Sequence, residues 1–372
     1  MRIAVPAETD AAETRVGATP ETVKKFVALG AHVSVESGAG LRSGILDADF
    51  AAAGASIAAD HEADIVLRVR RPAEGDLHGL KAGALLIAIM DPYGHEAALA
   101  AMAAAGVSSF AMELMPRITR AQSMDVLSSQ ANLAGYRAVI DGAAEYGRAF
   151  PMMMTAAGTV PAARVFIMGV GVAGLQAIAT ARRLGALVTA TDVRPATKEQ
   201  VESLGAKFLA VEDEEFKQAQ TAGGYAKQMS PEYQAKQAAL VATHIAKQDI
   251  VIATALIPGR AAPRLVSADM VKSMRPGSVL VDLAIERGGN VEGAKFGETV
   301  DVGGVKIVGW SSALKLPATA SALYAKNLYA FVETMIDKKD RKLAVNWDDE
   351  LVKATLLTRD GAMVHPNFQP KA

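Results

Sequence analysis

The sequence contains no cysteine, which excludes disulfide bonds and thiolate zinc sites and makes a reducing, cytoplasmic setting the simplest expectation. A surplus of one charge is also absent. The net formal charge is −1 and there is no basic run, so neither nucleic acid nor an anionic membrane is expected as the main partner. The longest apolar stretches, 82–90 and 97–107, fall short of the ~20 residues that span a bilayer. We therefore expect a chain that does not itself cross a membrane.

Strand-like and helix-like segments alternate along the 372 residues, a length sufficient for about two domains. This alternation predicts an α/β fold in which parallel sheets are covered by helices on both faces. A helix is expected to open at Thr19, with Pro20 in its first turn, and to close at Gly30. The strands expected in this N-terminal region are 3–5, 32–35, 65–69, 85–90 and 107–112.

A long helical pattern over 124–148 separates the N-terminal region from a second series of strands and helices. Because a last helical stretch and an apolar tail follow, we expect the chain to cross back and complete the first domain. The fold class predicted is two Rossmann-like, doubly wound parallel-sheet domains separated by a cleft. The expected domains are 1–126 plus 318–372, and 127–317. The further elements expected are helices at 197–204 and 319–336 and strands at 207–209, 249–253, 278–283 and 305–308.

The second domain opens with the pattern of a dinucleotide-binding unit. A short apolar strand, 165–168, leads into Gly169, Gly171 and Gly174, whose missing side chains let backbone amides approach a pyrophosphate. The helix that follows directs its N-terminus at that phosphate. A glycine pattern alone is weak, but the flanking strand and helix make it specific.

The next strand ends at Asp192, whose carboxylate can accept hydrogen bonds from a ribose 2′-hydroxyl and would repel a 2′-phosphate. This favours NAD(H) over NADP(H) as the bound cofactor. Arg194, two residues further on, could instead pair with a phosphate.

A polar run, 113–130, lies between the two expected domains, where a loop can reach a ligand beyond the carboxyl ends of the strands. The competing interpretation is a solvated linker followed by a helix N-cap. The residues alone do not separate the two.

Several motifs in the chain resemble the NAD(H)-binding subunit of proton-translocating transhydrogenase. They include Arg-x-x-Arg-Ala-Gln-Ser-Met-Asp at 117–125, Gly-Val-Gly-Val-Ala-Gly-Leu-Gln at 169–176, and Ala-Gly-Gly-Tyr-Ala-Lys at 222–227. The resemblance covers nearly the whole chain. It implies a homodimeric subunit that binds NAD(H) and transfers hydride to NADP(H) on a partner subunit. A separate membrane-spanning subunit would carry the protons, and this chain would lie peripherally on the cytoplasmic face of the inner membrane.

The resemblance also implies site residues. Those expected to serve in catalysis are Arg117, Gln122, Asp125, Ser128 and Tyr225, the last on a loop expected to close over the nucleotide. Those expected at the cofactor are Arg117, Ile118, Thr119, Gln122, Ser123, Met124 and Asp125 in the first loop, Gly169, Val170, Gly171, Val172 and Gly174 in the phosphate turn, Asp192, Val193 and Arg194 after the next strand, and Gly224, Gln237 and Leu256.

The main alternative is alanine dehydrogenase, which has the same fold and needs an acid or base at its substrate. Arg15 matches a substrate-carboxylate arginine of that family. However, an arginine stands near 68–70 where its lysine is expected, Ile89 stands where its catalytic histidine is expected, and Glu286 replaces an aspartate. A regulator that kept the fold but lost catalysis is a third alternative, which the intact Arg-Gln-Asp loop disfavours. The histidines show no metal-ligand spacing, so no metal site is expected.

Overall fold

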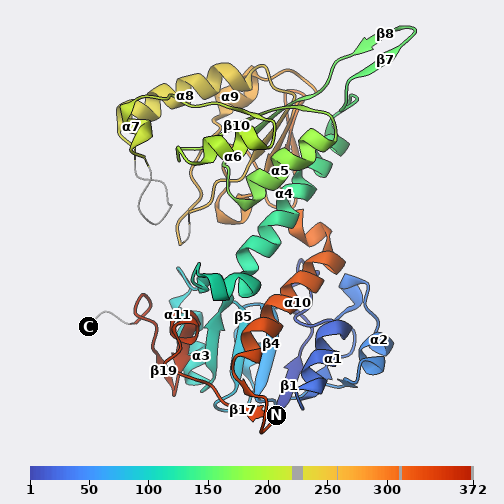
Figure 1. Ribbon diagram of the computed structural model, residues 1–372, viewed down its shortest axis with the longest axis vertical. Helices are drawn as coiled ribbons and strands as arrows, with labels where there is room; N and C mark the ends of the chain where they lie inside the picture. Colours follow the sequence, from blue (N-terminus) through green and yellow to red (C-terminus); the bar gives the residue numbers. More distant parts are fainter. Residues whose placement is uncertain (220–228, 258, 310–311, 370–372) are drawn as a thin grey trace. The chain divides into compact units, whose positions relative to one another are not determined.

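The computed structural model describes residues 1–219, 229–257, 259–309 and 312–369 (Figure 1). The chain divides into two compact units. Unit 1 contains residues 1–130 and 314–372, and unit 2 contains residues 131–313. The boundaries predicted from the sequence, after 126 and before 318, remain predictions. No helix among the described residues is long and apolar enough to cross a membrane.

Unit 1 is built on an eight-stranded sheet of order β19-β18-β6-β5-β4-β1-β2-β3. The first six strands of the chain run parallel to one another, whereas β18 is antiparallel to both β6 and β19. The returning C-terminal segment therefore extends the sheet at its β6 edge. The strands are β1 (Arg2–Val5), β2 (His32–Val35), β3 (Ser56–Ile57), β4 (Ile65–Arg70), β5 (Leu85–Ile89), β6 (Ser108–Ala111), β18 (Leu356–Arg359) and β19 (Ala362–Met363).

Helices cover both faces of this sheet. Successive side chains of a strand point to opposite faces, so each strand contributes apolar side chains to two cores. Ile3 and Ile65 belong to a core that includes Phe331 of α10, whereas Val66 joins a second core with Leu99 of α3. The helices of unit 1 are α1 (Pro20–Ala28), α2 (Asp47–Ala52), α3 (Glu96–Ala104), α10 (Pro317–Glu333) and α11 (Glu350–Thr355), and the small antiparallel pair β16 (Ile336–Asp337) and β17 (Lys342–Leu343) follows α10.

Unit 2 is built on a seven-stranded sheet of order β11-β10-β9-β12-β13-β15-β14, in which the first five strands, β9 to β13, follow the same order as β1 to β5 of unit 1. All neighbours are parallel except β14 and β15. The strand β14 was not predicted from the sequence. The strands are β9 (Arg164–Met168), β10 (Leu187–Thr191), β11 (Lys207–Phe208), β12 (Ile250–Ala253), β13 (Val279–Asp282), β14 (Thr299–Val302) and β15 (Val305–Val308).

The sheet of unit 2 is also covered on both faces. Ile167 packs in a core with Ile178 of α5, while Phe166 packs in another with Ile245 of α8. This arrangement brings the N-terminus of α5 to the carboxyl end of β9. The helices of unit 2 are α5 (Val172–Arg183), α6 (Thr197–Ser203), α7 (Glu214–Lys217), α8 (Pro231–Ile245) and α9 (Ala268–Ser273).

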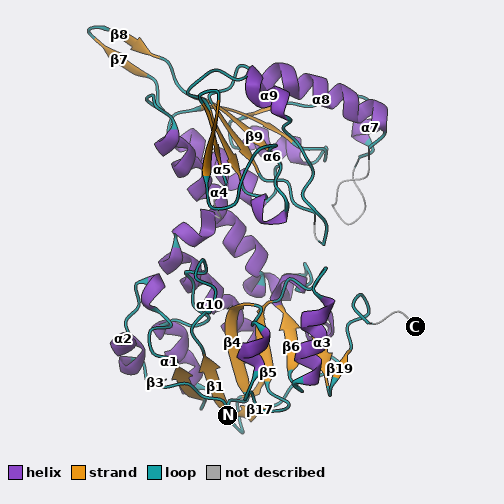
Figure 2. Ribbon diagram, turned by 180° about the vertical axis from the view of Figure 1, so that it is seen from behind, coloured by secondary structure: helices purple, strands orange, loops and turns teal. Residues whose placement is uncertain are grey.

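The helix expected over 124–148 is α4, Val126–Glu145, and the chain passes from unit 1 to unit 2 within it. After α4, the chain forms an unexpected antiparallel hairpin of β7 (Met153–Thr155) and β8 (Gly158–Val160). Figures 1 and 2 show this hairpin as an arm that projects from unit 2. Residues 151–159 are all exposed, so no burial pattern could have indicated these strands.

Candidate functional site

The three glycines of the phosphate turn lie where β9 passes into α5, and each has a different structural role. Gly169 has φ +99°, a conformation that L side chains rarely adopt. A Cβ on Gly174 would lie 1.9 Å from the carbonyl oxygen of Gly169, so only a glycine lets α5 begin this close to the strand. Gly171 needs neither allowance, since a Cβ there would meet nothing within 4 Å.

The turn therefore leaves a side-chain-free space at Gly171, next to the N-terminus of α5. The first N–H groups of a helix have no acceptor within the helix, and the helix dipole favours an anion there. Gly171 and Val172 are both exposed at this point. Because a methyl group at Gly171 would fill the space, this turn fits the diphosphate of a dinucleotide.

Asp192 lies beside the turn at the end of β10, and both of its carboxylate oxygens are hydrogen-bonded within the chain. Oδ2 accepts the N–H of Val170 at 2.8 Å, and Oδ1 accepts the N–H of Arg194 at 2.9 Å. The Arg194 guanidinium donates to both oxygens, each at 2.9 Å, and also to the Val170 carbonyl at 3.1 Å. The hydrogen bond with Asp192 raises the pKa of Arg194 above its usual value. Val193 lies between the two partners.

Gln237 on α8 is hydrogen-bonded to residues at this edge of the sheet. Its amide nitrogen donates to Thr191 Oγ1 at 2.9 Å, and its amide oxygen accepts the N–H of Val211 at 2.9 Å. Because Thr191 directly precedes Asp192, the bond to Thr191 holds Gln237 close to Asp192. Leu256, after β12, is 54% exposed. Gly224 and Tyr225 lie outside the described residues.

Two polar residues that shape this edge, Thr254 and Asn290, were not predicted from the sequence. Thr254 donates from Oγ1 to the Gly169 carbonyl at 3.0 Å and supports the glycine turn. Asn290 is fully buried and clamps Ala255 through both amide atoms, at 2.9 and 3.1 Å. Thr254 directly follows a predicted strand, so its position could have been inferred. The glycine-rich sequence around Asn290 gives no comparable signal.

In unit 1, residues 117–125 form an exposed turn built on a short 3₁₀ helix, Thr119–Met124. Arg117, Thr119, Gln122 and Ser123 are exposed, Ile118 is half-buried, and Met124 is buried beneath them. Arg120 makes a bidentate ion pair with Asp349 at the start of α11, in which two guanidinium nitrogens lie 2.7 and 2.9 Å from the two carboxylate oxygens. The turn is thus anchored to the C-terminal segment.

Asp125 ends this turn and caps α4. Its carboxylate accepts the Ser128 N–H at 2.9 Å and the Ser128 hydroxyl at 2.5 Å. The helix N-cap considered for this run is therefore present. It explains why α4 begins at Val126 and not at the predicted residue 124. The cap brings Asp125 and Ser128 together, two of the residues that the resemblance implies at the site.

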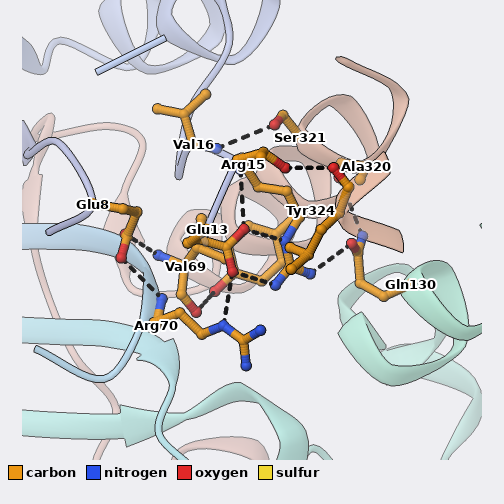
Figure 3. A network of polar contacts seen from close by, with 12 residues as sticks. Glu8, Glu13, Arg15, Val16, Val69, Arg70, Gln130, Ala320, Ser321 and Tyr324 are labelled. Carbon is orange, nitrogen blue, oxygen red and sulfur yellow. Dashed lines mark hydrogen bonds and ion pairs between the residues drawn. The ribbon is translucent and has the colours of Figure 1, made fainter. Parts of the chain in front are cut away.

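Unit 1 also contains a buried charge network around Glu13 and Arg15 (Figure 3). Glu13 accepts from Arg15 through both carboxylate oxygens, each at 2.7 Å, and from Arg70 Nε at 2.7 Å. Burial raises the pKa of Glu13, but the Arg15 hydrogen bonds and charge outweigh burial and leave the pKa below its usual value. The remaining Arg15 nitrogen donates to Gln130 at 2.9 Å. A substrate carboxylate at Arg15 would therefore have to displace Glu13.

Among the described residues, no group of three His, Asp or Glu side chains could hold a metal ion.

The family models described as the alanine dehydrogenase/PNT N-terminal and C-terminal domains match residues 4–134 and 138–366. The chain belongs to this family. Its members are NAD(P)-binding oxidoreductases, and the two-domain Rossmann-like fold predicted from the sequence is confirmed.

The relatives specify the branch of the family. The chain is 54% identical to an NAD(P) transhydrogenase subunit alpha protein of Rhodospirillum rubrum, over 98% of each chain. It is 62% identical to the solved transhydrogenase of Sinorhizobium meliloti, with a TM-score of 0.90 over 98% of this chain and 100% of that one. Identity to the alanine dehydrogenase of Mycobacterium tuberculosis is 32%, over 79% of this chain and 75% of that protein. The predicted resemblance to transhydrogenase alpha subunits is confirmed, and the alanine dehydrogenases are more distant.

Proposed function

We propose that the chain is the NAD(H)-binding subunit of a proton-translocating NAD(P)+ transhydrogenase. In this proposal it takes part in direct hydride transfer between NADH and NADP+ held on a partner subunit. The side-chain-free space at Gly171, beside the Asp192 carboxylate, carries the proposal for the nucleotide. The transhydrogenase relatives supply the class of reaction.

Unit 2 would hold the dinucleotide. Gly171 and Val172 would meet the diphosphate with their N–H groups, and Asp192 would accept the adenosine ribose hydroxyls once Arg194 yields one of its hydrogen bonds. A carboxylate at this place disfavours a 2′-phosphate, which supports NAD(H) as the cofactor. Gln237 and Leu256 would contact the same nucleotide, as the resemblance implies.

Unit 1 would supply the residues that act at the nicotinamide, with Arg117, Gln122, Asp125 and Ser128 as the candidates. Bound NADH supplies the hydride, so the protein needs no general base. Its residues need only orient the reactants and exclude water. An amide with a donor and an acceptor, such as that of Gln122, is suited to linking groups on two nucleotides. Tyr225 is proposed to close over the nucleotide.

The partners follow from the same proposal. An NADP(H)-binding subunit would accept the hydride, and a membrane-spanning subunit would carry the protons. The chain would be a homodimer placed peripherally on the cytoplasmic face of the inner membrane by these subunits. The names of the relatives, which are transhydrogenase alpha subunits, support the existence of further subunits.

The experiment mixes this chain with a transhydrogenase NADP(H)-binding subunit and follows hydride transfer from NADH to an NADP+ analogue. We expect transfer only when both proteins are present. Gln122→Asn withdraws the amide by one C–C bond, and we expect it to lower kcat by about 10- to 100-fold because reaction geometry tolerates little displacement.

Gln200→Asn, an exposed change of the same kind on α6, is the control and should leave kcat unchanged. L-alanine and NAD+ are tested in parallel with the chain alone. Oxidation of alanine without a partner would overturn the proposal in favour of an amino-acid dehydrogenase.

A further inference from the structure

The side chain of Asn327 ties the turn that carries Gln122 and Asp125 to α10. Its amide nitrogen donates to the Ser123 carbonyl at 2.7 Å, and its amide oxygen accepts the Ser129 hydroxyl at 2.7 Å. Asn327 is 7% exposed. One buried amide therefore connects the backbone of the turn to the first turns of α4.

The contact continues into the buried charge network. Gln130 donates to the Ala320 carbonyl at 3.1 Å and to Ser129 Oγ at 3.3 Å, and its amide oxygen accepts from Arg15. Figure 3 shows the Gln130 side chain joined by hydrogen bonds to both Arg15 and Ala320. Because Glu13 also binds Arg15, the network restrains Ser129, the partner of Asn327 on α4.

Asn327 lies on the buried face of α10, next to Leu328 and one turn from Tyr324 and Phe331, all of which are in the apolar core. An amide in such a place costs free energy unless it is hydrogen-bonded. Both of its polar atoms are directed at residues 123 and 129 and not at its own helix. An apolar residue could fill the same volume, but it could not hold the Ser123 carbonyl.

We propose that Asn327 is a positioning residue for hydride transfer, which fixes the 117–125 turn through the Ser123 carbonyl and thereby places Gln122. The inference rests on the proposed function, since it needs Gln122 to act at the nicotinamide. Gln122 is exposed and directly precedes Ser123, so its position depends on the backbone that Asn327 holds. A displacement of about 1 Å at a reacting group can cost about 100-fold in rate.

The test compares Asn327→Ala, Asn327→Asp and Lys326→Ala in the complete chain, assayed with the NADP(H)-binding subunit. Asp keeps the acceptor for Ser129 but at neutral pH cannot donate to Ser123. We therefore expect both Asn327 variants to lose about 10- to 100-fold in kcat. The affinity for NADH, measured with the chain alone, should change less than about twofold, because the phosphate turn belongs to unit 2. Lys326, the preceding residue on α10, makes an exposed ion pair with Glu21 of α1, and its replacement should leave both values unchanged.

Hydrogen–deuterium exchange of residues 117–125 gives a readout independent of activity. Exchange should be faster in both Asn327 variants than in the wild-type chain and in Lys326→Ala. If the wild-type chain transfers hydride and either Asn327→Ala or Asn327→Asp keeps the wild-type kcat, this inference is overturned while the proposed function stands. A loss of kcat without faster exchange in the turn also overturns it. Absence of transfer by the wild-type chain overturns the proposed function, and this inference with it.

Discussion

At the scale of single residues, the proposed nucleotide site predicts that the pair Asp192 and Arg194 determines the choice between NADH and NADPH. Asp192 holds the Arg194 guanidinium through two hydrogen bonds, and its own side chain is 8% exposed. Asp192→Ala would remove the proposed ribose acceptor and release an arginine that can pair with a 2′-phosphate. We expect the Kd for NADH to rise by about 10- to 100-fold and the Kd for NADPH to fall, measured by fluorescence titration.

The control is Asp192→Ala combined with Arg194→Ala. This double variant should lose NADH affinity to a similar extent but gain nothing for NADPH, since the released cation is gone. NADPH binding by Asp192→Ala that is no tighter than in the wild-type chain would contradict the assignment of the pair. The sequence predicted both residues as candidates, but it could not show that they bind each other.

At the scale of the element, substitutions at two glycines of the β9–α5 turn should have different effects: Gly174→Ala on the stability of the fold, and Gly171→Ala on nucleotide binding. A Cβ at position 174 would collide with the backbone of Gly169, so Gly174→Ala should cost about 1–3 kcal/mol of the free energy of unfolding or more. Gly171 has φ −82°, which alanine adopts freely, and has open space around it. Gly171→Ala should therefore cost at most about 1 kcal/mol.

For NADH affinity, the larger effect is expected at Gly171. Gly171→Ala places a methyl group where the diphosphate would lie, so NADH affinity should fall at least about tenfold while the unfolding midpoint stays near that of the wild type. Thermal unfolding and NADH titration of both variants provide the check. If Gly171→Ala binds NADH normally, the diphosphate does not lie at this turn.

Elements with a strong local signal in the sequence were predictable, and elements without one were not. The strands at 32–35 and 305–308 match β2 and β15, because short runs rich in valine and isoleucine, in which apolar and polar residues alternate, are typical of strands. The β7–β8 hairpin is exposed on all sides and has no such pattern. The site divides in the same way. The glycines and Asp192 follow a motif, whereas Asn327 acts through contacts with residues about 200 positions away, which no local pattern reveals.

At the scale of the whole molecule, the two units differ in how the chain builds them. Unit 2 is one continuous segment with its own sheet and cores, whereas unit 1 needs residues from both ends of the chain. Its core contains Tyr324, Leu328, Phe331 and Val332 of α10, all fully buried. Each such side chain stabilises a fold by about 1.5–3 kcal/mol, and a domain is stable by only about 5–15 kcal/mol in total.

A fragment of residues 1–130 should therefore lack a cooperative unfolding transition, whereas a fragment of residues 126–313, which retains all of α4, should unfold cooperatively and bind NADH. Near-ultraviolet circular dichroism during heating distinguishes the two. Coexpression of 1–130 with 314–372 is the control, and it should restore the transition because it returns α10 to the core and β18 to the edge of β6. Cooperative folding of 1–130 alone would mean that the C-terminal segment only covers a unit that is already stable. In that case the ties from α10 and α11 to the 117–125 turn would be its main contribution.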